Sequence, residues 1–245
     1  MLRHSFDRAL MRSAARLTYN QVQAARDSAD KKLAPIIEPL YGAFAALSAA
    51  RDRRETMDLD VPERTIRLDA DGKVIDIAPR ERLDSHKLIE EFMIAANVAA
   101  AETLERVKQP CMYRVHDAPP DGKIDEFVEF ARGINLKFAR GQVVKPSLFN
   151  GLLKRARDMG ISDVVSQMVL RTQAQAEYST DNIGHFGLAL RRYCHFTSPI
   201  RRYSDLLVHR ALISGLGLGE GGLVRSTADL SWIGPLITGT ERRSV

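Results

Sequence analysis

Residues 84–101, DSHKLIEEFMIAANVAAA, predict the central helix of the fold. Apolar residues recur there at helical spacing and form a broad face, and the alanines permit close packing. Asp84 or Ser85 is suited to cap the start of the helix, which we expect to continue to about Arg106. The apolar face would consist of Leu88, Ile89, Phe92, Met93, Ala96 and Ala99.

Further helices and a few short strands are expected around this helix. Helical patterns cover residues 19–26, 124–132, 147–158, 162–174 and 203–214, and a second long helix carries a core-facing stripe of Ile36, Leu40, Phe44 and Leu47. Alternating residues at 64–68 and 73–77 predict a β-hairpin. Short strands are expected at 112–115, 177–180 and 185–190. The expected fold class is therefore α/β in the α+β sense, rich in helix, with short mixed or antiparallel strands.

Composition indicates a folded protein of an ordinary kind. The chain has 245 residues, 44% hydrophobic and 27% charged, which is enough for a packed core. A formal charge of +5 permits polyanion binding without requiring it. Cys111 and Cys194 lack metal-ligand spacing and predict a reducing compartment. Because no apolar run approaches the length of a membrane span, we expect a cytoplasmic location and no membrane partner.

A candidate anion site lies at residues 195–205, HFTSPIRRYSD. Thr197 or Ser198 can cap a helix that begins at the following proline. The free amide groups of that first turn would then lie beside Arg201 and Arg202, which is a suitable environment for a phosphate. The same pattern also suits an ordinary capped helix start with two solvated arginines.

Several segments, in a consistent order, resemble the catalytic domain of the ribonuclease II and ribonuclease R family, the RNB domain. They are SAARLTYNQVQ (13–23), DSHKLIEEFMIAANVAAA (84–101), YRVHDAPP (113–120), GHFGLALRRYCHFTSPIRRYSDLLVHRAL (184–212) and ERR (241–243). The resemblance covers roughly residues 6–214. It implies an enzyme that hydrolyses single-stranded RNA from its 3′ end to nucleoside 5′-monophosphates and uses Mg²⁺.

The resemblance also predicts how the chain is organised. Residues 1–214 would be part of the catalytic domain, and residues 215–245 a Gly-rich linker and truncated tail. The family's metal-binding aspartates lie upstream of the segment around Tyr19, so this chain is expected to hold no metal ligands. Asp58 and Asp60 imitate that cluster, but the sequence after them favours a turn. We expect either a fragment of an exoribonuclease or a non-catalytic RNA-binding or interaction remnant of one.

The resemblance assigns catalytic roles to two residues. Arg201 would contact the RNA backbone near the scissile phosphate, and its planar fork suits two phosphate oxygens. Glu90 would lie near the RNA end and assist catalysis, with Asn97 in support among the RNA-binding residues. From the helical pattern, the Glu90 carboxylate is expected to be partly buried. Glu91 is expected to be solvated or to form a structural ion pair.

Other residues are candidates for RNA contact. Tyr19 matches a family position at which a ring contacts a nucleotide, although a core tyrosine at a helix start also fits. Arg202 is a candidate together with Thr197 and Ser198, but it can instead pair with Asp205.

Some positions are expected to lack a catalytic function. A second family ring, which clamps the terminal base, would fall near Asp58, where this chain has no aromatic residue. His185 and His195 are expected to form structural hydrogen bonds instead of binding metal or transferring protons. Single-stranded RNA is the expected partner. The oligomeric state is open, and exposed apolar surface on a fragment would favour self-association.

Overall fold

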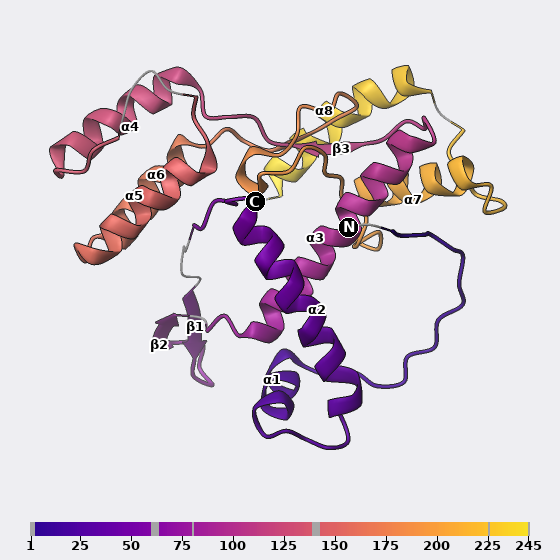
Figure 1. Cartoon of the computed structure of the whole chain (residues 1–245), viewed down its shortest axis with the longest axis horizontal. Coiled ribbons are helices and arrows are strands. Elements are labelled where there is room, and N and C mark those ends of the chain that lie inside the picture. The colour runs from indigo at the N-terminus through magenta and orange to yellow at the C-terminus, as the bar shows by residue number, and fades with distance from the viewer. Residues whose placement is uncertain (1–2, 60–63, 80, 139–142, 225, 245) are drawn as a thin grey trace.

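The structure, a computed structural model, describes residues 3–59, 64–79, 81–138, 143–224 and 226–244. This part of the chain is rich in helix and contains short antiparallel strands, as expected (Figure 1). The helices are α1 (Tyr19–Asp27), α2 (Ala34–Arg53), α3 (Asp84–Arg106), α4 (Asp121–Gly133), α5 (Pro146–Asp158), α6 (Ser162–Thr172), α7 (Tyr203–Leu216) and α8 (Thr227–Arg243). Strand β1 (Arg64–Leu68) pairs with β2 (Val74–Pro79), and β3 (Tyr113–Val115) pairs with β4 (Glu177–Ser179).

Helix α3 is the central element, as predicted. It contacts α1 and α2 near its start and α7 further along (Figure 1). Ala100, Ala101 and Leu104 are fully buried, and they join residues of β3, α7 and α8 in one core cluster. The predicted cap is wrong, because Leu83 occupies the N-cap position and neither Asp84 nor Ser85 caps the helix with its side chain.

Helix α2 packs through a face that only partly matches the predicted one: Phe44 of the predicted stripe packs against the cluster on this face, but Ile36 does not. Ile36 is 62% exposed, whereas Ile37 and Tyr41 are buried against Leu88 of α3. Leu40 of the predicted stripe is also exposed. Apolar residues occupy both neighbouring faces of this helix, so its periodicity could not choose between them. The position of α3 made the choice.

Helices α4, α5 and α6 form a separate packed group at the left of Figure 1. Its centre consists of Phe127, Phe149, Leu152 and Val165, all almost completely buried. The segment that follows α2 connects this group to the rest of the molecule, since Met57 is part of the same cluster. The amide of Met57 donates to the carbonyl of Gly187, 3.2 Å away.

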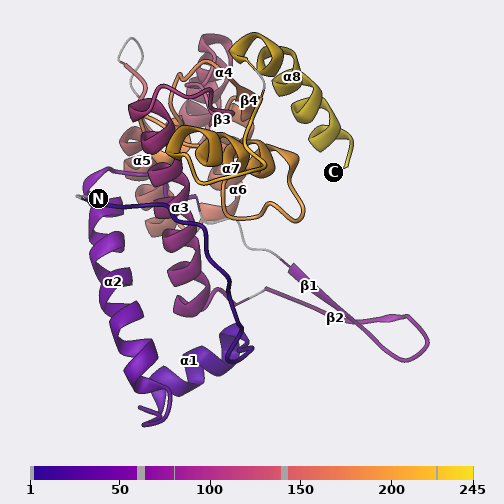
Figure 2. The same ribbon diagram turned by 90° about the vertical axis from the view of Figure 1, so that its right-hand side faces the viewer.

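The β1–β2 hairpin confirms the predicted hairpin and projects from the body of the molecule (Figure 2). Ile66 faces Ile77 across the pair, and Leu68 faces Val74. Each of these four side chains is more than half exposed. The hairpin therefore presents apolar side chains to solvent.

Two predicted features differ in the structure. Residues 185–190 do not form a strand, because a 3₁₀ turn at Phe186–Leu188 reverses the chain and Ala189 adopts a left-handed conformation. Helix α7 continues past Ser214 and ends at Gly217, whose φ of 62° suits glycine.

The Gly-rich segment after α7 is tied to the body of the molecule. Arg8 donates to the carbonyls of Leu218 and Glu220 at 3.2 and 2.9 Å. Helix α8 packs against β4, and its Leu230 belongs to the same core as α3. The division of the chain between residues 214 and 215 stays a prediction, but α8 shares the core of the preceding elements.

Candidate functional site

The SPIRR segment forms a turn ahead of α7 and does not form the start of the helix. Helix α7 begins at Tyr203, and neither Thr197 nor Ser198 caps it. The amides of Arg201 and Arg202 both donate to the carbonyl of Ser198, at 3.2 and 3.1 Å. The predicted capping arrangement is therefore wrong.

The Ser198 amide donates to the carboxylate of Asp205, with an N–O distance of 2.7 Å. Arg202 donates to both oxygens of the same carboxylate, at 2.7 and 2.8 Å. Asp205 is completely buried, which disfavours its charge, but the hydrogen bonds from Arg202 and Ser198 hold its pKa below the ordinary value. The expected pairing of Arg202 with Asp205 is confirmed, so the Arg202 fork is already occupied.

Arg201, by contrast, is exposed at the end of the turn. The described residues provide it with no hydrogen bond or ion pair through its side chain. Its neighbour Ile200 is 97% exposed, so the turn protrudes from the surface. Thr197 lies at the base of the turn with its hydroxyl oxygen buried and without a protein partner among the described residues. Arg201 is thus the basic side chain of this turn that is available to a ligand.

Asn97 supports the chain just before the turn. Its side-chain nitrogen donates to the hydroxyl of Tyr193 at 2.9 Å, and its side-chain oxygen accepts from the amide of Phe196 at 2.9 Å. Only 1% of the residue is exposed. Both groups of the amide are used inside the protein, which argues against direct contact with a ligand.

The Glu90 side chain is partly buried and hydrogen-bonded, as expected, and Glu91 forms the structural ion pair that was one of its two expected states, but Glu91 is the more deeply buried of the two. Glu91 is buried and pairs with Arg51 at 3.1 Å, whereas the Glu90 side chain is 44% exposed and pairs with Arg82. Helix α2 packs on the Glu91 side of α3 and brings Arg51 to it. Helical position alone did not show on which side α2 would lie.

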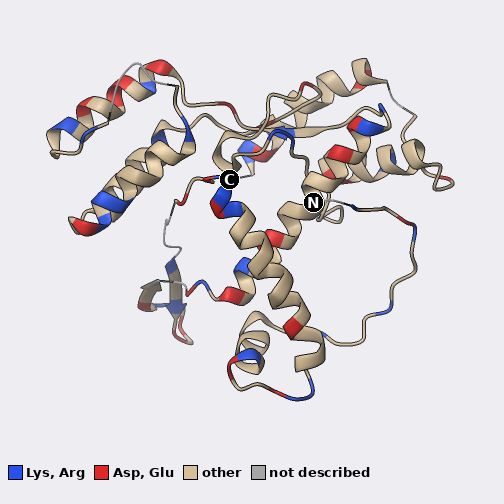
Figure 3. Ribbon diagram, viewed as in Figure 1, with Lys and Arg blue, Asp and Glu red and all other residues tan. Residues whose placement is uncertain are grey.

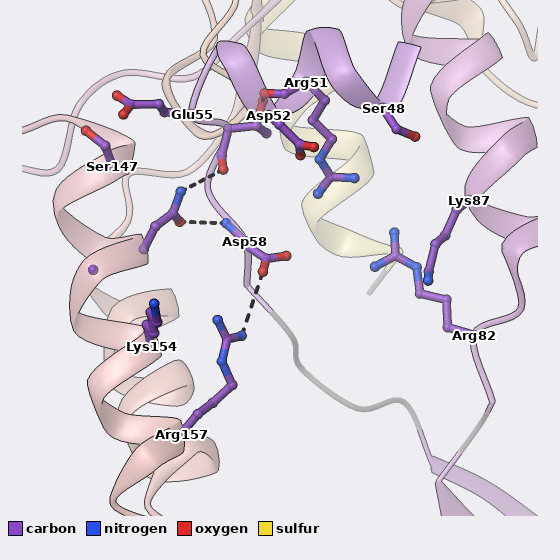
Figure 4. Close-up of a pocket in the computed structure, with 13 residues that line it drawn as sticks. Ser48, Arg51, Asp52, Glu55, Asp58, Arg82, Lys87, Ser147, Lys154 and Arg157 are labelled. Carbon is purple, nitrogen blue, oxygen red and sulfur yellow. Dashed lines mark hydrogen bonds and ion pairs between the residues drawn. The ribbon is translucent and has the colours of Figure 1, made fainter. Parts of the chain in front are cut away.

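A polar pocket of about 600 Å³ lies between the end of α2, the start of α3 and α5 (Figure 4). Figure 4 shows Arg51, Arg82 and Lys87 on one side of this space, with Asp58 and Arg157 opposite. Asp58 pairs with Arg157 at 3.7 Å. Both arginines that hold the glutamates of α3 therefore also line this pocket. Figure 3 shows basic residues at the end of α2 and along α5.

Asn150 fixes one wall of the pocket. Its side-chain oxygen accepts from the amide of Asp58 at 2.8 Å, and its side-chain nitrogen donates to the carbonyl of Thr56 at 3.0 Å. Sequence reasoning missed Asn150, Lys154 and Arg157. Their spacing of four and three residues places them on one face of α5, and that was the signal available.

Tyr19 lies apart from the turn. Its ring stacks on His86 at a centroid distance of 4.1 Å and is 43% exposed, so it is not a core tyrosine. His86 belongs to the first turn of α3, whereas Asn97 lies about 16 Å further along the helix by its rise per residue. The described structure does not bring Tyr19 to Arg201.

The histidines form structural hydrogen bonds, as expected. A ring nitrogen of His195 lies 2.9 Å from the hydroxyl of Tyr178, and His185 accepts from the amide of Leu188 at 3.3 Å. Burial lowers the pKa of each of these two histidines to about 3. Both rings are therefore neutral at physiological pH.

The carboxylates of this region do not fit a divalent-metal site. Glu90, Glu91 and Asp58 each face an arginine. Asp60 lies outside the described residues. Among the residues that are described, no three His, Cys, Asp or Glu side chains come together in a way that could hold a metal ion.

Within the described ranges, no helix is both long and apolar enough to cross a membrane.

Comparison with known sequences identifies relatives of the whole chain. The sequence model of the RNB domain matches residues 1–217. Ribonuclease R of Vibrio cholerae is 37% identical, over 96% of this chain and 31% of that protein. Ribonuclease R of Escherichia coli is 38% identical, over 85% of this chain and 26% of that protein. The chain spans between about a quarter and a third of the length of these curated relatives.

Solved structures show the same fold. Ribonuclease R of Mycoplasma genitalium, in complex with ribose-methylated single-stranded RNA, superimposes with a TM-score of 0.81 at 27% identity, over 91% of this chain and 36% of that one. The same protein in complex with double-stranded RNA superimposes with a TM-score of 0.78 at 26% identity, over 91% of this chain and 41% of that one. Yeast Ssd1, a pseudonuclease, shares the fold with a TM-score of 0.66 at 17% identity, over 90% of this chain and 27% of that one. Together with the match to residues 1–217, these similarities show that the chain belongs to the RNB-domain family, that of the ribonuclease R exoribonucleases.

Proposed function

We propose that this chain is part of the catalytic domain of an enzyme that degrades single-stranded RNA from its 3′ end and releases nucleoside 5′-monophosphates. The observation that carries the proposal is the exposed Arg201 on a turn braced by a buried ion pair. A free guanidinium carried on a braced backbone can bind two phosphate oxygens. Membership of the RNB family supplies the reaction class.

Arg201 would act as an electrostatic clamp on the scissile phosphate. Negative charge builds up on the phosphate oxygens during hydrolysis, and a cation already in place stabilises that charge without reorganising. Ser198 lies in the same turn and would approach the same part of the backbone, whereas the Thr197 hydroxyl is buried at the base of the turn. Arg202 contributes indirectly in this proposal, because Asp205 occupies its fork.

The pocket beside Glu90 would receive the terminal part of the RNA. Its basic side chains come from α2, α3, α5 and the segment before α3, and Lys154 has no ion-pair partner among the residues described. Glu90 lies at the edge of this pocket through its pair with Arg82 and is exposed enough to reach a ribose. None of the described residues that line the pocket is aromatic, so they offer no ring on which to clamp a base.

The enzyme proposed here requires Mg²⁺, which would activate water and neutralise the phosphate. The described carboxylates do not fit that ion, so we assign them no metal step. For the chain by itself, the arginine pairing of Glu90, Glu91 and Asp58 favours a second function, which is RNA binding without hydrolysis.

Incubation of the repurified chain with a labelled single-stranded oligonucleotide and Mg²⁺ separates the two functions. Binding without release of monophosphates supports the second function for the isolated chain. Release of monophosphates that persists through repurification would show that the chain catalyses by itself. Absence of any RNA binding would refute both.

A further inference from the structure

The carboxylate of Asp205 contacts both ends of the turn that carries Arg201. It accepts from the amide of Ser198 at 2.7 Å before the exposed arginine, and from the side chain of Arg202 at 2.7 and 2.8 Å after it. The hydroxyl of Ser204 also donates to it, at 3.2 Å. A single buried group therefore connects the start of the turn to its end.

The base of this connection is rigid. Asp205 lies in the first turn of α7, where Leu207 and Val208 are buried in the main core. Before the turn, the Phe196 ring stacks on His209 of the same helix with a centroid distance of 4.3 Å. The turn is thus held against α7 on both sides.

The same carboxylate also distinguishes the two adjacent arginines. It accepts from Nε and one Nη of Arg202 in a two-point contact and compensates the charge of that side chain, whereas Arg201 is left exposed. Two neighbouring cations would otherwise compete for one phosphate in different geometries. With Arg202 occupied, one guanidinium remains, on a short and well-supported loop.

We propose that Asp205 is a positioning residue: it fixes the turn at residues 198–202 and selects Arg201 as the arginine that meets the RNA phosphate. This inference rests on the phosphate role proposed above for Arg201. A fixed cation loses less conformational freedom on binding than a mobile one, so the anchor strengthens the contact without touching RNA.

A double-mutant cycle on the full chain tests the coupling. The variants are Arg201→Ala, Asp205→Asn and the combination, and the readout is affinity for a fluorescent single-stranded oligonucleotide at several salt concentrations. Loss of one phosphate contact lowers the salt slope by about 0.7, which corresponds to about fivefold weaker binding at 0.1 M salt. Arg201→Ala is expected to show this loss, Asp205→Asn most of it, and the double variant no more than Arg201→Ala alone.

Ser204→Ala is the matched control. It removes a hydrogen bond to the same carboxylate but leaves the contacts to the turn, so RNA affinity should match that of the unmodified chain. Hydrogen exchange at the Ser198 amide provides a readout that does not depend on RNA. Exchange should accelerate in Asp205→Asn and stay slow in Ser204→Ala.

The outcomes separate the two proposals. If Arg201→Ala leaves RNA affinity unchanged, the phosphate role of Arg201 fails. If Arg201→Ala weakens binding but Asp205→Asn does not, or if the two losses add, the positioning role of Asp205 is refuted and the phosphate role stands. Tighter RNA binding by Asp205→Asn would show that a freed Arg202 binds RNA, and this result would also refute the positioning role of Asp205.

A second variant covers the case in which Asp205→Asn does not fold. Arg202→Lys keeps a positive charge beside Asp205 but loses the two-point contact. It should weaken RNA binding in the unmodified chain and have no effect in the Arg201→Ala background. Unchanged affinity in both backgrounds would overturn the positioning role.

Discussion

Arg201 and Arg202 are adjacent, but their replacement by alanine should have opposite kinds of consequence. Arg202→Ala removes the ion-pair partner of Asp205, whose side chain is 0% exposed. Breaking a buried pair by removing one partner costs about 3–5 kcal/mol. The Arg202 side chain is 18% exposed, and Asp205 keeps its bonds from Ser198 and Ser204, so we expect a loss in unfolding free energy of about 3 kcal/mol.

Arg201→Ala should leave stability unchanged within about 0.5 kcal/mol, because an exposed side chain without a partner contributes little to folding. For a chain of this size, each kcal/mol shifts the melting temperature by about 2–4 °C. Thermal unfolding of the two variants and the unmodified chain should therefore separate them by about 6–12 °C. Equal melting temperatures would refute the assignment of the buried pair, and a large loss in Arg201→Ala would refute its freedom from structural contacts.

Turnover should show the reverse order in a version of the protein that also contains an active metal site. Removal of a preorganised electrostatic contact typically costs about 10²–10³ in kcat. Arg201→Ala should therefore lower turnover far more than RNA affinity, since a long RNA keeps its other phosphate contacts. Single-turnover cleavage of a labelled oligonucleotide measures this, and a loss confined to affinity would contradict the proposed clamp.

Three further results are expected. Burial lowers the pKa of His185 and His195 to about 3, so the unfolded chain binds more protons than the folded one between about pH 6.5 and 3. The unfolding free energy should therefore fall by about 3 kcal/mol from pH 7.5 to 5.5, and His195→Gln should reduce that fall. A flat profile would contradict the buried state of the two rings. The exposed apolar side chains of the β1–β2 hairpin should promote self-association, which analytical ultracentrifugation would detect. Ile66→Lys should weaken this association. A monodisperse unmodified chain would overturn the expectation. Asn150→Ala should speed hydrogen exchange at the Asp58 amide and lower the free energy of unfolding by about 1–2 kcal/mol. Ser147→Ala, in the same pocket, is the control. Unchanged exchange at Asp58 would show that the side chain of Asn150 does not hold that segment.

Part of the candidate site followed from the sequence because it is local. Arg201 and Arg202 are adjacent, and Asp205 lies one helical turn after Arg202, so their proximity needed no knowledge of the fold. The pairing of Arg202 with Asp205 was predicted on that basis and is confirmed. The pocket beside Glu90 was not predicted, because its basic side chains come from α2, α3, α5 and the segment before α3.

The sequence by itself determined the family and the helical elements other than α8, because both depend on residues close together in the chain. Helical periodicity predicted α3 and α5, and alternation around a turn predicted the hairpin. Such patterns reflect backbone hydrogen bonds between near neighbours, which repeat without reference to distant segments. The family likewise follows from the order of motifs along the chain, which can be read without knowing which residues are in contact.

Only the tertiary structure decided which of two similar groups is buried. Ile37 is buried where Ile36 was predicted, and Glu91 is more deeply buried than Glu90. In each case the two candidates are adjacent in sequence and chemically alike, so local pattern favours neither clearly. The residue that selects one of them lies on another helix: Leu88 of α3 for Ile37, and Arg51 of α2 for Glu91. Burial and charge pairing are set by that three-dimensional neighbour, which the periodicity of one helix does not contain.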